Sequence, residues 1–262
     1  MSPPNADSDD RRIEAPEPSA PSHGAVDYRA EFYALYRSTH VGPRKGAATA
    51  EAHRRRFAKW DLLLGPYLPS SRDAVVVDCG CGNGPIVSWL VQRGYSKAVG
   101  IDASQEEVDA ARALALPVER ARITEFLAKH TGSVDFVILR NVLEHHYKHE
   151  IVEILKRTRE AMTEGGRVFI QVPNAETPFG ARLRYADFSH EVAFTSSSIS
   201  QVLRVCGFDE IETGPVRTGA RGWRRLVWRA TELLYKSLLR AELGNQEFIV
   251  TQDLFAVGRR AR

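Results

Sequence analysis

The chain has 262 residues, 43% of them hydrophobic and 26% charged, which is enough to bury one sizeable core. Its net charge of +3 is small and its charges are mixed, which argues against a nucleic-acid partner, and three cysteines argue against a disulfide scaffold. No apolar run reaches the roughly 20 residues of a membrane span, and the polar N-terminus lacks the apolar region of a secretory signal, so we expect a cytoplasmic protein.

Residues 1–25 are polar and rich in proline, serine and aspartate. They offer too little apolar surface to offset the entropy of ordering, which predicts a disordered tail. Residues 26–70 then carry apolar side chains at helical spacing, including Tyr28 and Phe32 in one run and Phe57, Trp60 and Leu64 in another. We expect two helices joined by a mobile loop at residues 38–47, together forming an N-terminal helical lid.

Residues 71–258 alternate short β-rich runs with helical runs, which is typical of a parallel sheet covered on both faces. We expect strands at residues 74–80, 98–104, 134–141, 167–174 and 208–213, and a last β-rich segment at 246–259. The expected helices are at residues 85–94, 104–114, 148–166 and 196–208, with Ser104 capping the second and glycines closing the third.

The stretch VVVDCGCGNG, residues 75–84, places three glycines between a strand and a helix. Such a turn lets the backbone approach a ligand closely. The next strand ends at Asp102, where comparable folds place a carboxylate against ribose hydroxyls, so we expect a nucleoside-containing ligand. Asp78 opens the turn and would repel a phosphate, which favours a cationic ligand. Cys79 and Cys81 lack metal-site spacing, so their sulfurs are expected to be incidental.

These motifs carry a family resemblance. VVVDCGCGNG followed by GIDAS resembles the first two motifs of class I S-adenosylmethionine-dependent methyltransferases, and VDFVILRNVLEHH with GGRVFIQVPN resembles the later ones, in the branch that includes the ubiquinone-pathway O-methyltransferases. The resemblance covers about residues 70–215. It implies an α/β, Rossmann-like fold with a seven-stranded, mostly parallel sheet whose last strand is antiparallel, and S-adenosyl-L-methionine as cofactor.

The resemblance also implies roles for residues around the cofactor. Four would line its methionine part: Asp78, Gly80, Cys81 and Gly82. Five others would contact the rest, with Asp102 on the ribose, Ala103 and Ile123 near the adenine, and Arg140 and Asn141 near the methyl group. The family often has an acidic residue against the adenine after the third strand, and this chain has Arg122 or Ile123 there instead.

Methyl transfer to a hydroxyl requires alignment and removal of one proton, for which histidine is the natural base near neutral pH. The first candidate is His145, in LEHHYKHE at residues 143–150. One alternative is that His145 packs beside the cofactor, and another is a metal site of His145, His149 and Glu150. The usual H-E-x-x-H order is absent, so we expect no metal.

The second candidate base is His190, in RYADFSHEVAFTSSSI at residues 184–199. This polar segment follows the fifth strand, where α/β folds carry substrate loops. We expect it to bind the acceptor, through Arg184, Tyr185, Asp187 and Glu191. The alternative is a capping segment in which Thr195 starts the next helix. The string DFSHEVAFT also resembles segments of methyltransferases that act on sugars.

An insertion at residues 214–245 contains a basic amphipathic helix. Residues 223–240 are compatible with peripheral contact to an anionic membrane, and also with packing on the chain itself or in a homodimer. Overall the sequence favours O-methylation of a sugar hydroxyl on a polysaccharide or lipid-linked glycan, with no nucleic-acid partner. The alternatives are a small-molecule O- or N-methyltransferase, acting on a quinone precursor or natural product, and a non-catalytic cofactor-binding scaffold.

Overall fold

The computed structural model describes Tyr28, Phe32 and residues 49–217, 222–244 and 247–261. The predicted tail at residues 1–25 and the predicted loop at 38–47 lie outside the described residues, as does nearly all of the first predicted helix. Among the described residues, no helix combines the length and the apolarity that crossing a bilayer requires.

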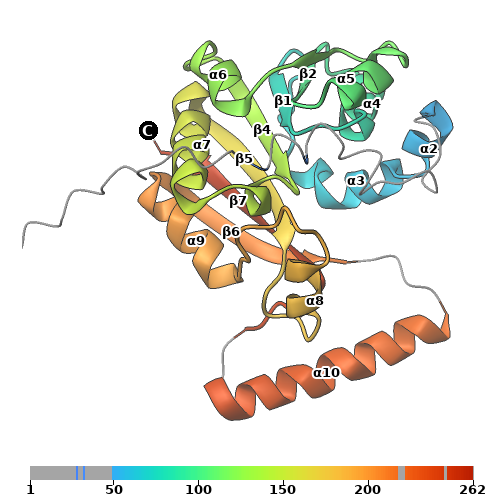
Figure 1. Ribbon diagram of the computed structural model, residues 1–262, viewed down its shortest axis with the longest axis vertical. Coiled ribbons are helices and arrows are strands. Elements are labelled where there is room, and N and C mark those ends of the chain that lie inside the picture. The colour runs from blue at the N-terminus through green and yellow to red at the C-terminus, as the bar shows by residue number, and fades with distance from the viewer. Residues whose placement is uncertain (1–27, 29–31, 33–48, 218–221, 245–246, 262) are drawn as a thin grey trace, which may run out of the picture.

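One seven-stranded sheet forms the centre of the molecule, in the order β3-β2-β1-β4-β5-β7-β6 (Figure 1). The first five strands pair in parallel, and β7 runs antiparallel to both of its neighbours. The strands are β1 (Val75–Cys79), β2 (Lys97–Asp102), β3 (Val118–Arg120), β4 (Val134–Arg140), β5 (Met162–Pro173), β6 (Phe208–Val216) and β7 (Asp253–Arg260). The predicted fold class is therefore confirmed.

Helices cover both faces of this sheet, and each face has its own apolar core. On one face lie α6 (Ile123–Ala128), α7 (Lys148–Ala161) and α9 (Ser196–Val205), and on the other lie α3 (Phe57–Leu63) and α4 (Pro85–Gln92). A smaller cluster buries α5 (Gln105–Arg112) next to β3. The remaining helical elements are α2 (Ala50–Arg54), η3 (Gly65–Tyr67), η4 (Leu143–His145), α8 (Gly180–Tyr185) and α10 (Trp223–Leu243).

Two boundaries differ from the sequence prediction. The helix predicted at residues 148–166 ends at Ala161, because the fully buried Met162 already pairs with Val134 as the first residue of β5. Gly165, with a φ of +73°, then lies in a part of β5 where the register with β4 shifts, so this glycine belongs to an irregular strand. The second helical run predicted before the sheet is broken between α2 and α3.

The second of these helices is part of the core. Trp60 on α3 and Leu64 just after it are 1% and 0% exposed, and they pack with α4 against the sheet. Residues 57–64 of the predicted lid thus form part of the covering layer of the domain.

Candidate active site

The chain order of the strands reverses between β1 and β4, which lie side by side at the centre of the sheet. In open α/β sheets ligands bind outside the carboxyl ends of the strands at such a reversal. Here β1 brings Asp78 to that edge and β4 brings Arg140. The residues predicted for the cofactor therefore lie where the topology itself favours a ligand.

The glycine turn after β1 is held by the neighbouring strand. The N–H of Gly80 donates to the carbonyl oxygen of Ile101 at 2.8 Å, and the N–H of Gly82 donates to Oδ2 of Asp102 at 2.8 Å. Gly80 has a φ of +71°, and a Cβ on it would lie 2.5 Å from Cγ2 of Val142. A side chain therefore does not fit at Gly80 unless Val142 or the turn moves.

Two carboxylates flank this turn. Asp78 is 2% exposed, and its burial raises the pKa to about 7, an effect that the positive charge of Arg140 partly opposes. Asp102 is held by two backbone N–H groups, because its Oδ1 also accepts from Ser104 at 2.8 Å. A buried carboxylate and a fixed carboxylate beside an open glycine turn fit a nucleoside that carries a cationic chain.

The other predicted cofactor residues lie around the same edge. Ala103 is exposed directly after β2, and the half-buried Ile123 begins α6, beside the end of β2 because the N–H of Ala121 donates to the carbonyl oxygen of Asp102. Asn141 follows β4 with a φ of +54°. Cys81 is buried, and burial raises its thiol pKa, so its sulfur is not poised for metal or redox chemistry.

The sequence did not reveal His53 as part of this region. His53, on α2, is 3% exposed, and its Nε2 lies 3.3 Å from Oδ1 of Asn83 in the glycine turn. This contact joins residues 30 positions apart in the sequence, and the sequence around His53 gives no signal that predicts it.

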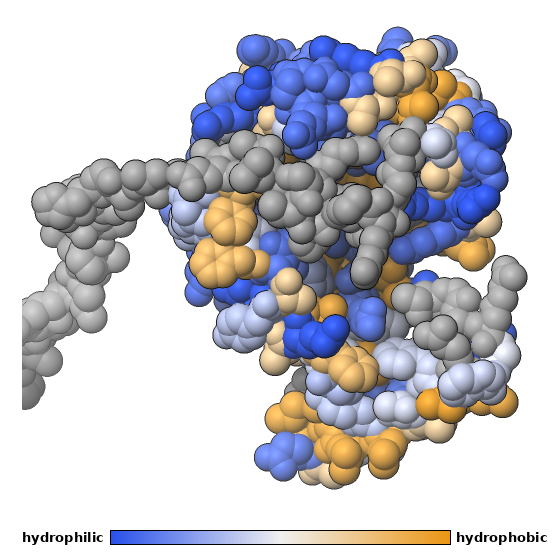
Figure 2. Space-filling view, turned by 45° about the vertical axis from the view of Figure 1, so that its right-hand side comes forward, coloured by the Kyte–Doolittle hydropathy of each residue, from blue (hydrophilic) through white to orange (hydrophobic). Residues whose placement is uncertain are grey.

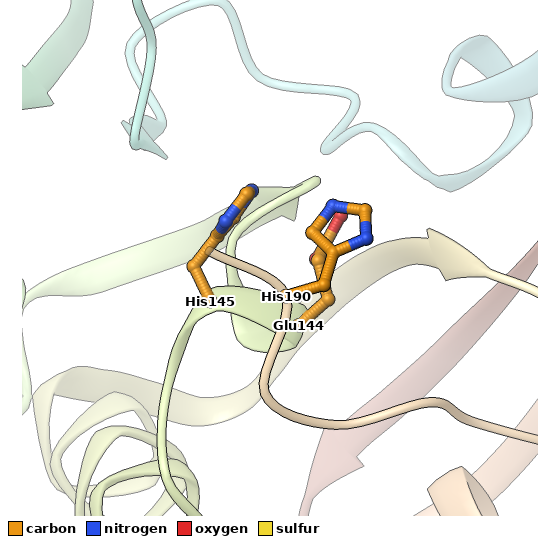
Figure 3. A group of neighbouring side chains, drawn as sticks. All are labelled: Glu144, His145 and His190. Atoms are coloured by element: carbon orange, nitrogen blue, oxygen red, sulfur yellow. The ribbon is translucent and has the colours of Figure 1, made fainter. Parts of the chain in front are cut away.

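The two predicted bases are brought together. The imidazole rings of His145 and His190 have centroids 4.8 Å apart at an angle of 62°, although one follows β4 and the other follows β5 (Figure 3). Nδ1 of His190 lies 3.0 Å from the carbonyl oxygen of Leu183. A carbonyl only accepts, so Nδ1 carries a proton, and in the neutral ring Nε2 then carries the lone pair.

A hydrogen-bond relay orients His145 in the same way. The hydroxyl of Ser189 donates to Oδ1 of Asp187 at 2.7 Å, so its oxygen accepts from Nδ1 of His145 at 2.9 Å. All three residues are buried, at 7% exposure or less. The sequence prediction included His145 and Asp187 but missed Ser189, which connects them.

Glu144 completes a compact group with the two histidines. One potential ligand atom of each of Glu144, His145 and His190 lies within 4.8 Å of the others, so this cluster has the donors to hold a divalent metal ion (Figure 3). Glu144 is 0% exposed, its carboxyl oxygens have no hydrogen-bond partner on another described residue, and burial raises its pKa to about 8.

The metal alternative weighed from the sequence named different partners and is wrong in that respect. His149 is exposed on α7, where its ring stacks on Tyr147 at a centroid distance of 5.9 Å. The carboxylate of Glu150 accepts from the N–H of Tyr147 at 2.8 Å and so caps the helix. Both residues therefore contact Tyr147 at the N-terminus of α7.

The predicted acceptor residues lie together in the loop that precedes α9. Arg184 donates to the carbonyl oxygen of Glu191 at 2.9 Å, and the N–H of Glu191 donates to the carbonyl oxygen of Glu144 at 2.7 Å. The carboxylate of Glu191 accepts a hydrogen bond from the hydroxyl of Tyr28. Tyr185 is 79% exposed. Arg184, Glu191 and Asp187 therefore fix the loop, and Tyr185 faces solvent.

The predicted cap of α9 is also present. Thr195 accepts from the N–H of Ser198 at 3.1 Å, while Oγ of Ser198 accepts from the N–H of Thr195. The segment therefore caps α9 at its end, as the second interpretation of the sequence predicts, and carries the buried histidine relay before the cap. Acceptor binding by this segment stays a prediction.

A single buried asparagine joins this loop to the segment that follows α10. Asn174, 1% exposed, forms a bridge with Phe194, and the next N–H, of Ala175, donates to the carbonyl oxygen of Phe194 at 2.7 Å. The side-chain amide of Asn174 donates to the carbonyl oxygens of Ile249 and Thr251, the latter at 2.9 Å. The loop that carries the predicted acceptor residues, called the acceptor loop below, and the segment that returns from α10 are thus held by the same residue.

Comparison with known proteins identifies the family of the chain. A family model described as a methyltransferase domain matches residues 50–213. The chain is 27% identical over 192 residues to a tRNA U34 carboxymethyltransferase of Enterobacter sp. (strain 638), a match that covers 69% of this chain and spans 58% of that protein's length.

Solved structures share the fold. A SAM-dependent methyltransferase from Archaeoglobus fulgidus superposes with a TM-score of 0.62 at 17% identity, covering 87% of this chain and all of the other. A phosphoethanolamine N-methyltransferase 2 from Haemonchus contortus, solved in complex with S-adenosyl-L-methionine, superposes with a TM-score of 0.56 at 12% identity, covering 88% of this chain and 60% of the other.

Proposed function

The chain belongs to the methyltransferase-domain family and shares the fold of a SAM-dependent methyltransferase, and from this premise we propose that it is a class I, S-adenosylmethionine-dependent enzyme that methylates a hydroxyl group. The observation that carries the proposal is the relay from Asp187 through Ser189 to His145, beside His190. A hydroxyl needs a base, and two imidazoles with oriented lone pairs supply one.

Bound S-adenosylmethionine supplies a methyl group on a sulfonium, which is already activated for displacement. The residues of the chain then need to align the acceptor and take up its proton. Asp187 and Ser189 hold the Nδ1 proton of His145, which leaves Nε2 to receive the proton of the acceptor. The carbonyl oxygen of Leu183 likewise holds the Nδ1 proton of His190.

For the acceptor we propose a sugar hydroxyl on a polysaccharide or lipid-linked glycan. The support is the polar loop before α9 and the resemblance of DFSHEVAFT to segments of sugar methyltransferases. The loop offers the exposed Tyr185 beside Arg184, whose guanidinium lies 5.3 Å from the ring centroid. An RNA acceptor, suggested by the name of the tRNA-modifying relative, is the competing outcome.

The experiment is transfer of a tritiated methyl group from S-adenosylmethionine to a panel of glycans, small hydroxyl and amine acceptors, and tRNA. We expect turnover on a hydroxyl acceptor that is lost in His190→Ala while calorimetry still detects cofactor binding. His149→Ala is the matched control, because His149 is exposed outside the cluster. Transfer only to amines or to RNA would contradict the proposal.

A further inference from the structure

Helix α10 carries half of the large apolar side chains that are exposed in the described part of the chain. Their exposed fractions run from 54% to 73% for Trp223, Leu226, Val227, Leu233, Leu234, Leu238 and Leu243. Figure 2 shows this hydrophobic surface gathered on the outer side of the helix, away from the body of the molecule. Contiguous exposed apolar surface of this kind marks an interaction site.

The helical geometry separates α10 into two faces. Successive residues are about 100° apart around a helix, and all of these apolar residues except Leu243 fall within one arc of about 140°, which we call the outer strip. No charged residue falls within this arc. Trp228, Tyr235 and Leu239 lie outside it and are half-buried, so the exposed and the half-buried large side chains occupy different faces of α10.

One edge of the outer strip is basic. Arg229 and Arg240 are exposed beside it, and neither of them forms a salt bridge with a residue that the structure describes. Lys236 is paired with Glu232 at 2.9 Å. With five basic and two acidic residues, α10 has a net charge of 5 − 2 = +3.

We propose that α10 lies on an anionic lipid bilayer, with the outer strip in the interface and Arg229 and Arg240 on lipid phosphates. An apolar strip with tryptophan at one end and arginine along its edge is the composition of interfacial helices. A second copy of the chain fits less well, because it would bring one +3 helix against another. Burial of the strip supplies the main attraction, and the charge selects the lipid.

The placement of α10 suits this role. Its 21 residues extend about 32 Å, and α8, which opens the acceptor loop, lies between the sheet and α10 in Figure 1. Docking through the outer strip would therefore bring the acceptor loop close to the bilayer surface. The inference concerns this surface alone and does not depend on the identity of the acceptor.

The test is flotation of the full chain with vesicles of phosphatidylcholine, alone or mixed with phosphatidylglycerol. We expect the chain to float with the anionic vesicles, several-fold less with phosphatidylcholine alone, and less as salt is raised. The double variant Leu226→Glu/Leu234→Glu should lose flotation. Leu62→Glu is the matched control, because Leu62 is 83% exposed on α3, outside the strip, and this variant should float like the unmodified chain.

All the substituted leucines are exposed, so the variants should fold, and cofactor binding measured by calorimetry checks that they do. Three results would overturn the proposal. The unmodified chain fails to float with anionic vesicles, the double variant floats as well as the control, or light scattering shows a dimer that the double variant breaks while no form of the chain floats.

Discussion

The Oγ atom of Ser189 lies 2.9 Å from Nδ1 of His145, and the same hydroxyl donates a hydrogen bond to Oδ1 of Asp187. This bond fixes the ring of a histidine 44 residues away in the chain, so Ser189 is a positioning residue for the proposed base. The proposed chemistry can be tested at this serine without removing an imidazole.

We expect Ser189→Ala to lower kcat for methyl transfer by roughly five- to tenfold, since a neutral hydrogen bond contributes about 1 kcal/mol. Ser200→Ala is the control, because its hydroxyl donates within α9, to the carbonyl oxygen of Ser196. The pH profile of kcat should shift only in Ser189→Ala. If kcat and its pH profile are unchanged, the relay has no part in catalysis.

Zn²⁺ should inhibit the enzyme. Two imidazoles and a carboxylate are ligands that Zn²⁺ favours, and an ion held by Glu144, His145 and His190 would occupy the lone pairs that accept the proton. Initial rates with added Zn²⁺ should fall and recover on addition of EDTA, and His149→Ala should respond like the unmodified enzyme. Activation by Zn²⁺ would instead identify the cluster as a working metal centre.

The charge of Asp78 should make the ligand-free protein less stable as pH rises from about 4 to about 7. The Asp78 carboxyl keeps its proton up to about pH 7 in the folded protein, whereas it releases the proton near pH 3.8 in the unfolded chain. The free energy of unfolding therefore falls as the pH rises through that range. Replacement by the uncharged Asp78→Asn should therefore raise Tm at pH 8 more than at pH 5. Equal changes at both pH values would contradict the raised pKa.

Cofactor affinity should change in the opposite direction. A cationic ligand prefers the ionised carboxylate, so calorimetric binding of S-adenosylmethionine should tighten between pH 6 and pH 8. In Asp78→Asn the binding should be weak and should lose this dependence on pH. A pH dependence retained in the variant would assign it to another group.

Gly80→Ala should abolish cofactor binding, because the new Cβ would lie 2.5 Å from Cγ2 of Val142 and the turn would have to move. Gly94→Ala is the control with the same kind of backbone, since Gly94 has a φ of +84° and nothing within 4 Å of a Cβ. It should cost about 1 kcal/mol of stability and leave binding intact. Thermal unfolding and calorimetry separate the two effects, and binding by Gly80→Ala would refute the role of the turn.

Local patterns allowed the sheet and the glycine turn to be predicted, because strand, glycine turn and Asp102 are close together in the sequence. The proximity of His145 and His190 was not predicted, since it arises when two loops meet at one edge of the sheet. Ser189 and Glu144 were missed because a serine or a glutamate in a polar segment gives no signal of burial. The end of α7 was misplaced because the glycines that follow it are typical of a helix terminus. The helix ends earlier, at Ala161, where the buried Met162 begins the next strand.

Asn174 has a consequence for how this protein can vary. Its backbone holds the acceptor loop and its side chain holds the segment that returns from α10, so two segments far apart in the sequence are joined at one residue. A change that loosens this residue should therefore disturb the loop before α9 and the segment after α10 together. A chimaera that exchanges either segment with that of another enzyme should therefore keep Asn174 and its hydrogen-bond partners intact.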